Sequence, residues 1–219
     1  MGDIFSIFPL GPEKVLHKLS NPKKATIYYY GYSLNLLNGK KERASIFDYL
    51  NLLDDKTVKN VDSVTEVHHL YYELAEVLLF KDCLKFQNEP LAIEIFYSKK
   101  VNFSQRSLVK DKKKFLFEEL SSICPNDYRD SFNKGMNELL QGNSYQFNYT
   151  SKFIYSYSDI NLDEFVSSFI ELGESRGQFA HLTYIPFLNK LIFSNTPEGL
   201  FQLRRKGDYL ECVSTPIKG

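Results

Sequence analysis

The sequence has no surplus of charge of either sign and no long apolar run. Lysine plus arginine and aspartate plus glutamate each total 27, so the formal net charge is zero. A chain without such a surplus has no strong field toward nucleic acid or a membrane surface, and we expect neither as a partner. The basic run at 110–114 (KDKKK) is interpreted as a solvated helix face. No apolar segment approaches the ~18 residues of a membrane-spanning helix.

Cysteine is scarce, and its placement excludes further classes of protein. Cys83, Cys124 and Cys212 lack metal-binding spacing, and three cysteines cannot all pair within one chain. The first ten residues (MGDIFSIFPL) lack the basic start and long apolar core of a signal peptide. Both observations favour the reducing cytoplasm. Dinucleotide-binding glycine motifs, a P-loop and a Ser–His–Asp signature are also absent.

What the chain does have is enough apolar material for a sizeable core. It has 219 residues, of which 43% are hydrophobic and 15% aromatic, and this fits one large domain or two small ones. Helical spacing of apolar residues predicts helices at 43–53, 63–80, 126–142 and 159–172. Alternation and β-branched or aromatic runs predict strands within 24–37 and at 90–98, 144–157, 177–185, 189–195, 198–207 and 208–219. The expected fold class is α+β, with an antiparallel β-sheet packed with helices.

Local signals refine several of these elements. Ser63 and Glu66 have the spacing of a capping box at the start of the helix 63–80. Asn126 or Asp127 is expected to cap the next helix, and Gly142 to close it. In the strand 90–98, one face is predicted to carry Leu91, Ile93, Ile95 and Tyr97.

The histidines are weak candidates for chemistry. His68 and His69 are expected on different faces of a helix, which makes them a poor pair of metal ligands. His181 lies in a predicted strand, where a core histidine with satisfied hydrogen bonds is the simplest interpretation.

Two other residues form a better candidate pair. Lys218 lies between Pro216 and Gly219, which could form a turn that directs its side chain inward. An amine acts as a nucleophile or base only when burial or a nearby cation lowers its pKa. Glu198 lies at the entrance of the preceding predicted strand, so a hairpin could bring the two residues together for acid–base work. By composition alone, an exposed lysine and a surface glutamate are the more common cases.

Three motifs in order change that balance. They are ELLQGNSYQFNYTSKF (138–153), SNTPEGLF (194–201) and STPIKG (214–219). Together they resemble the chorismate-utilising enzyme family, in which a glycine-terminated helix and a Y-Q-x-N-L-T-like strand are followed by S-P-E and then P-I-K-G or P-I-A-G. The agreement covers about 80 residues, and the first 120 residues match more loosely. The resemblance divides the chain into an N-terminal region, 1–120, and the start of the chorismate-binding catalytic region, 121–219.

The resemblance also implies a reaction. Lysine between Ile217 and Gly219 is typical of aminodeoxychorismate synthase component I, the large subunit of para-aminobenzoate synthase in folate biosynthesis. It implies that Lys218 attacks chorismate and that Glu198 transfers protons. Thr215 and Gly219 are expected to bind the substrate. A glutamine amidotransferase partner would supply the ammonia.

The sequence departs from the family pattern in length and in its tryptophan-pocket motifs, and these departures lead to two further hypotheses for its function. Family members are about twice as long, and their later half supplies the glutamates that bind Mg2+. We therefore expect a truncated or split chain, inactive and poorly soluble alone, that needs a complementary C-terminal half. The short motifs of the family's tryptophan pocket are reduced to YGYS (30–33) and GQFA (177–180). An isochorismate- or salicylate-forming enzyme and a non-catalytic remnant that binds an amino acid or the amidotransferase partner are the other two hypotheses.

Overall fold

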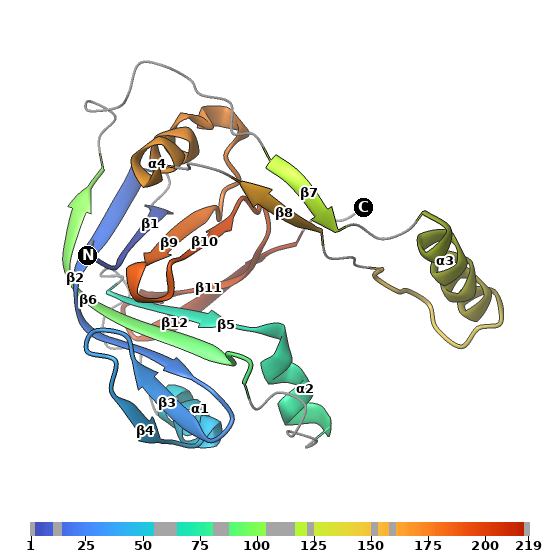
Figure 1. Ribbon diagram of the computed structural model, residues 1–219, viewed down its shortest axis with the longest axis horizontal. Helices are drawn as coiled ribbons and strands as arrows, with labels where there is room; N and C mark the ends of the chain where they lie inside the picture. Colours follow the sequence, from blue (N-terminus) through green and yellow to red (C-terminus); the bar gives the residue numbers. More distant parts are fainter. Residues whose placement is uncertain are drawn as a thin grey trace. The chain divides into compact units, whose positions relative to one another are not determined.

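The computed structural model describes residues 3–10, 15–54, 65–80, 88–103, 117–121, 125–149, 153–157 and 161–216. The chain forms two compact units, one from residues 1–107 and 172–219 and the other from 108–171 (Figure 1). The chain thus leaves the first unit and later returns to it. The regions 1–120 and 121–219 implied by the resemblance do not coincide with these units and stay a prediction.

The first unit is built on one large antiparallel sheet. Its strands are β1 (Phe5–Leu10), β2 (Val15–Tyr28), β3 (Tyr32–Asn35), β4 (Lys41–Arg43), β5 (Glu66–Leu70), β6 (Ala92–Asn102), β9 (His181–Ile185) and β10 (Lys190–Ser194). Six strands pair in the order β10-β9-β1-β2-β3-β4. The remaining two branch off at β2, which also pairs with β6, and β6 in turn pairs with β5. At 14 residues β2 is long enough to pair with β1 through its first part and with β3 through its last. The α+β prediction with antiparallel strands is confirmed.

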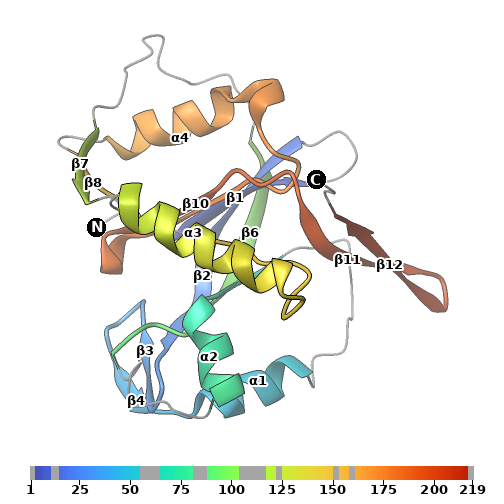
Figure 2. The same cartoon turned by 90° about the vertical axis from the view of Figure 1, so that its right-hand side faces the viewer.

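The strand predicted at 90–98 is confirmed as β6, and Leu91, Ile93, Ile95 and Tyr97 are all buried. The intervening residues Ala92 and Glu94 are buried as well. Ala92 is covered because α1 (Ile46–Asp54) and α2 (Tyr72–Phe80), the two helices labelled in Figure 2, pack against it. Leu91 belongs to the same cluster, so it does not share one face with Ile93, Ile95 and Tyr97 as predicted. The helix predicted at 43–53 is confirmed as α1.

The helix predicted at 63–80 is wrong in its first part. Residues Glu66–Leu70 form the strand β5, paired antiparallel with β6 from Phe96 to Ala92, and only α2 is helical. The capping box fails with it, because Glu66 lies in the strand, while Ser63 lies outside the described residues. Five residues carry little periodic signal, so backbone hydrogen bonds to a neighbouring strand decide their conformation.

Two hairpins complete the first unit. A short 3-10 helix, η3 (Pro186–Leu188), joins β9 to β10, and another, η2 (Gly173–Ser175), precedes them. The strands β11 (Gly199–Lys206) and β12 (Tyr209–Thr215) pair with each other around Gly207, whose φ of 62° suits glycine. The four strands predicted from residue 177 onward are confirmed within the described residues.

The second unit contains α3 (Pro125–Leu140), α4 (Leu162–Glu171) and the paired strands β7 (Phe117–Ser121) and β8 (Ile154–Tyr157). Gly142 adopts φ 76° and closes α3 as predicted. The predicted start is wrong, since α3 begins at Pro125 and both proposed caps lie inside it. The helix predicted at 159–172 is confirmed as α4, where Asn161 Oδ1 accepts the Asp163 N–H at 2.8 Å.

The strand predicted at 144–157 is shorter than expected. Only Ile154–Tyr157 are a strand among its described residues, and 144–149 form a loop. Two aromatic side chains of that loop pack back on α3, with ring centroids of Phe147 and Phe132 6.1 Å apart and those of Tyr149 and Tyr128 5.0 Å apart. Aromatic packing on a helix has replaced strand pairing here.

Candidate functional site

Of the two predicted catalytic residues, the structure describes Glu198, which lies directly before the hairpin β11–β12. Gly199 pairs with Thr215, and the Thr215 hydroxyl donates a hydrogen bond to the Gly199 carbonyl at 3.5 Å. Glu198 immediately precedes this pair. Lys218 and Gly219 lie outside the described residues.

The turn before β11 is tightly built. The Thr196 hydroxyl accepts the Glu198 N–H at 3.2 Å, and the Phe179 N–H donates to the Thr196 carbonyl at 3.0 Å. A Cβ on Gly177 would lie 2.3 Å from the Thr196 carbonyl oxygen, and one on Gly199 would lie 2.4 Å from the Phe179 ring. Gly177 therefore leaves no room for a side chain, because its neighbours are backbone atoms, whereas at Gly199 the Phe179 ring would have to move. The Glu198 side chain is exposed and Thr215 is half-buried, so the described residues do not form a dry site.

A cavity of about 570 Å³ lies elsewhere in the same unit. It is lined by Phe8, Val67, His68, His69, Leu70, Tyr71, His181, Lys190, Leu191, Ile192 and Phe193. These residues belong to β1, β5, β9 and β10, except Tyr71, which directly follows β5. Strands β5 and β9 are far apart in the order of the sheet, yet His69 Nε2 lies 3.0 Å from the Thr183 hydroxyl. The sheet must curl strongly to bring them together.

A chain of buried polar groups leads from this cavity into the core. The Thr183 hydroxyl lies 2.8 Å from that of Ser6, which lies 2.7 Å from the Tyr97 hydroxyl. Ser6 and Thr183 are fully buried, and burial raises the pKa of Tyr97. Because each hydroxyl can both donate and accept, the chain satisfies groups that would otherwise be costly to bury.

The surroundings of His69 and His181 favour the neutral form of both rings. Burial, reinforced by His181, His68 and Lys190, lowers the pKa of His69 to about 4. Burial also lowers the pKa of His181. The Lys190 ammonium donates to the Tyr71 hydroxyl at 2.9 Å and lies 4.8 Å from the centre of the Tyr71 ring.

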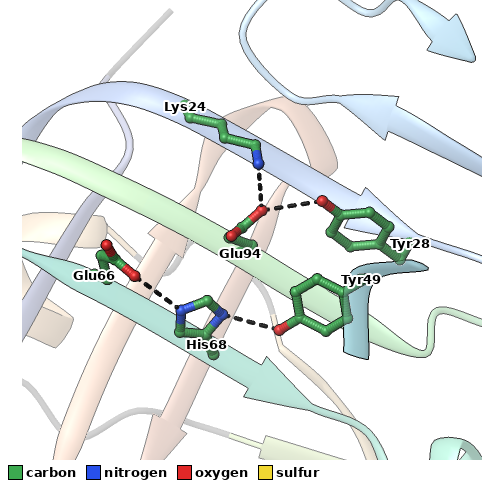
Figure 3. A network of polar contacts seen from close by, with 6 residues as sticks. All are labelled: Lys24, Tyr28, Tyr49, Glu66, His68 and Glu94. Atoms are coloured by element: carbon green, nitrogen blue, oxygen red, sulfur yellow. Dashed lines mark hydrogen bonds and ion pairs between the residues drawn. The ribbon is translucent and has the colours of Figure 1, made fainter. Parts of the chain in front are cut away.

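A second polar network lies on the opposite face of β6, and Figure 3 shows its six side chains. The Glu94 carboxylate is 2% exposed, contacts the Lys24 ammonium at 2.6 Å and accepts the Tyr28 hydroxyl at 3.0 Å. Beside it, His68 Nδ1 lies 2.9 Å from the Tyr49 hydroxyl and its Nε2 lies 3.4 Å from Glu66. His68 and His69 both line the cavity, but their rings have different partners, because neighbouring side chains of a strand point to opposite faces.

The cavity was missed by sequence reasoning. His69 was assigned to a helix and His181 to the core, and neither was connected with Lys190. No local signal could have joined them, because β5 and β9 are separated by more than a hundred residues. The assignment of His181 to a strand is confirmed.

Among the described residues, no group of three or more His, Cys, Asp or Glu side chains could hold a metal ion. Within the same residues, no helix combines the length and apolar character needed to cross a membrane.

No protein-family model, curated protein or solved structure matches this chain.

Proposed function

We propose that the chain is the N-terminal portion of a cytoplasmic chorismate-utilising enzyme of the aminodeoxychorismate synthase component I type. The observation that supports this is the register of the last hairpin. Pairing of Gly199 with Thr215 brings the TPE motif, with Glu198, to the same end of the hairpin as the first residues of the TPIKG motif. The proposal joins these two motifs, which are separated by the 16 residues 199–214, at one place in the fold.

The chemistry follows from a neutral lysine and a carboxylic acid. The Lys218 amine forms a bond to carbon 2 of chorismate while the bond between carbon 4 and its hydroxyl breaks, and Glu198 donates the proton that makes the departing group water. Ammonia then attacks carbon 4, the bond from Lys218 to carbon 2 breaks, and the surplus proton returns to Glu198. Chorismate and ammonia become 4-amino-4-deoxychorismate and water. Thr215 and Gly219 contact the substrate in this proposal, and a glutamine amidotransferase supplies the ammonia.

The experiment is a product assay on the polypeptide encoded by the complete reading frame, with chorismate, Mg2+ and ammonia. We expect 4-amino-4-deoxychorismate by mass spectrometry, its loss in Lys218→Ala, and a rate lower by about a hundredfold in Glu198→Gln. Glu171→Gln, at the exposed end of α4, is the matched control and should leave the rate unchanged.

Three outcomes would contradict the proposal. Isochorismate or salicylate as product would favour the water-activating branch of the family. An unchanged rate in the Lys218→Ala variant would show that Lys218 is not the nucleophile. Turnover by residues 1–219 alone would contradict the expected need for a complementary C-terminal half.

A further inference from the structure

The cavity between β5, β9 and β10 has an unbalanced lining. The basic residues on it are His68, His69, His181 and Lys190, and among the residues that the structure describes no aspartate or glutamate lines it. The ring nitrogens of His68 are turned to Tyr49 and Glu66, so three basic side chains, His69, His181 and Lys190, are left for a ligand. Glu66, the carboxylate that contacts His68, is not part of the lining. None of these residues belongs to the candidate site at Glu198 and Thr215.

Lys190 is held in place by a hydrogen bond and a ring contact, both to Tyr71. It forms no ion pair among the described residues, whereas Lys24 and Lys40 each contact a carboxylate at 2.6 Å. Its ammonium instead donates to the Tyr71 hydroxyl and lies over the Tyr71 ring. A fixed cation in a partly buried cavity attracts an anion more strongly than a mobile surface lysine does.

The two histidines can add to this attraction. His69 Nε2 contacts Thr183, and His181 Nδ1 lies 3.4 Å from the Phe179 carbonyl. A protonated imidazole donates from both ring nitrogens, so each ring can keep its protein contact and donate a second hydrogen bond to a ligand. Without an anion, burial lowers the pKa of both rings, and for His69 the charges of His181, His68 and Lys190 lower it further.

The remaining walls are apolar and partly planar. The Phe8 ring stacks on His181 with centroids 5.6 Å apart and planes inclined by 14°, and Val67 and Ile192 also line the cavity. Its volume of about 570 Å³ falls within the ~300–1,000 Å³ of small-molecule sites. The walls suit a flat apolar body attached to the charged group.

We propose that this cavity binds a small organic anion that carries one carboxylate on a planar apolar body, and that binding takes up a proton on His69 or His181. A free amino acid is a poorer fit, because its ammonium would meet three basic side chains, His69, His181 and Lys190, and no carboxylate among the described lining residues. The proposal does not depend on the chemistry proposed for Lys218 and Glu198.

The proton uptake depends on the groups that face the histidines from each neighbouring strand. On β5 His68 is the next residue in the chain and its charge acts on His69, on β10 the fixed charge is Lys190, and β9 contributes His181 itself. From β1 the neighbours are Phe8 and the neutral Ser6, and from β6 the neutral Tyr97. On β2, His17 pairs with Phe8, and burial and Lys100 lower its pKa. The one carboxylate that this structure shows in contact with a histidine of the cavity is Glu66, 3.4 Å from His68. The other groups named here are neutral or cationic, so a bound anion would offset the repulsion around His69 and His181.

The test uses a matched pair of probes, 3-phenylpropionate and L-phenylalanine, which differ only by the α-ammonium group. Calorimetry should show 3-phenylpropionate binding more tightly, with affinity rising about tenfold for each pH unit between pH 7.5 and 5.5 when one proton is taken up. NMR titration of the four imidazoles should show the pKa of His69 or His181 rising when the ligand binds.

Variants locate the site. Lys190→Met should weaken binding of 3-phenylpropionate at least tenfold. Lys41→Met is the matched control, because Lys41 also lies over a tyrosine ring, 3.6 Å from the centre of Tyr32, outside the cavity. Equal effects of the two variants would contradict the site. So would affinity independent of pH, tighter binding of L-phenylalanine, or imidazole titrations in the wild-type protein that the ligand does not change.

Discussion

At the scale of single residues, a buried carboxylate is the most sensitive point in the molecule. Glu94 lies in the central strand β6 and is neutralised by Lys24 on β2, the neighbouring strand. Tyr28 adds a hydrogen bond, and burial followed by the Glu94 charge raises the pKa of that phenol. A buried charge is tolerated only when paired and hydrogen-bonded in this way.

We expect Glu94→Gln to lower the free energy of unfolding by about 2 kcal/mol, because it leaves the Lys24 ammonium without its counterion. This is below the range for fully buried pairs because the Lys24 side chain is 44% exposed. Glu42→Gln is the control, since Glu42 contacts Lys40 at the same 2.6 Å on the surface, and it should have no measurable effect. Urea titrations of the two variants test this, and equal losses would contradict it.

His69 predicts a pH dependence of stability. Its folded-state pKa of about 4 lies below the ~6.5 of an unfolded chain, so between these values the unfolded state binds a proton that the folded state does not. Stability is therefore lost as the pH falls from about 6.5 toward 4, by roughly 1 kcal/mol per pH unit. His69→Gln keeps a hydrogen-bonding group near Thr183 and should flatten this slope. Parallel slopes for variant and wild type in urea titrations at several pH values would exclude the assignment.

At the scale of elements, short segments take their conformation from what lies next to them. Residues 66–70 lie in a region with helical spacing, yet they form the strand β5 because they pair with β6. Residues 144–149 alternate like a strand, yet they form a loop whose aromatic side chains pack on α3. Where a segment is long and its pattern regular, as in α3, the local signal is sufficient.

The close contact between Gly177 and the Thr196 backbone, just before β11, gives a prediction at the scale of elements. Gly177→Ala should destabilise the protein by about 1–3 kcal/mol, because the new methyl group would meet the Thr196 backbone, which cannot rotate away as a side chain could. Gly31→Ala is the control, since a Cβ there has no neighbour within 4 Å and the φ of Gly31 is not positive. It should be neutral or slightly stabilising. Thermal unfolding of both variants gives the comparison, and equal melting temperatures would refute the proposed clash.

At the scale of the whole molecule, pairing between distant segments dominates. Strand β1 pairs with β2, its neighbour in sequence, and also with β9, more than 170 residues later. The large sheet therefore cannot form until most of the chain has been assembled, which favours slow folding.

The core of this sheet should carry much of the stability of its unit. Ile93→Ala in β6, at 0% exposure, should cost about 3–4 kcal/mol through lost burial and the cavity left behind. Ile154→Ala in β8 makes the same chemical change at a site 43% exposed and should cost less than about 1 kcal/mol. Denaturant titrations followed by circular dichroism measure both costs, and a similar cost at the two sites would contradict this picture of the core.

The sequence predicted the fold class and most elements, but fewer of the candidate sites. It indicated α1, α3, α4, β6 and the two C-terminal hairpins, because each has a regular apolar pattern or a clear turn residue such as Gly207. It also indicated Glu198 and Thr215 through their motifs, which the register of β11–β12 brings together. It did not indicate the cavity around His69, because nothing near His69 in sequence points to His181 or Lys190.

The division between the two levels has a physical reason. Periodicity, turn chemistry and charge balance act over a few residues, so the sequence by itself determined the antiparallel α+β class, the absence of a charged field and the ordered motifs. Which strand lies beside which is decided by burial and backbone hydrogen bonds between segments far apart in the chain. Only the tertiary structure could therefore make β5 a strand, split His68 from His69, and gather three basic side chains from β5, β9 and β10 around one cavity.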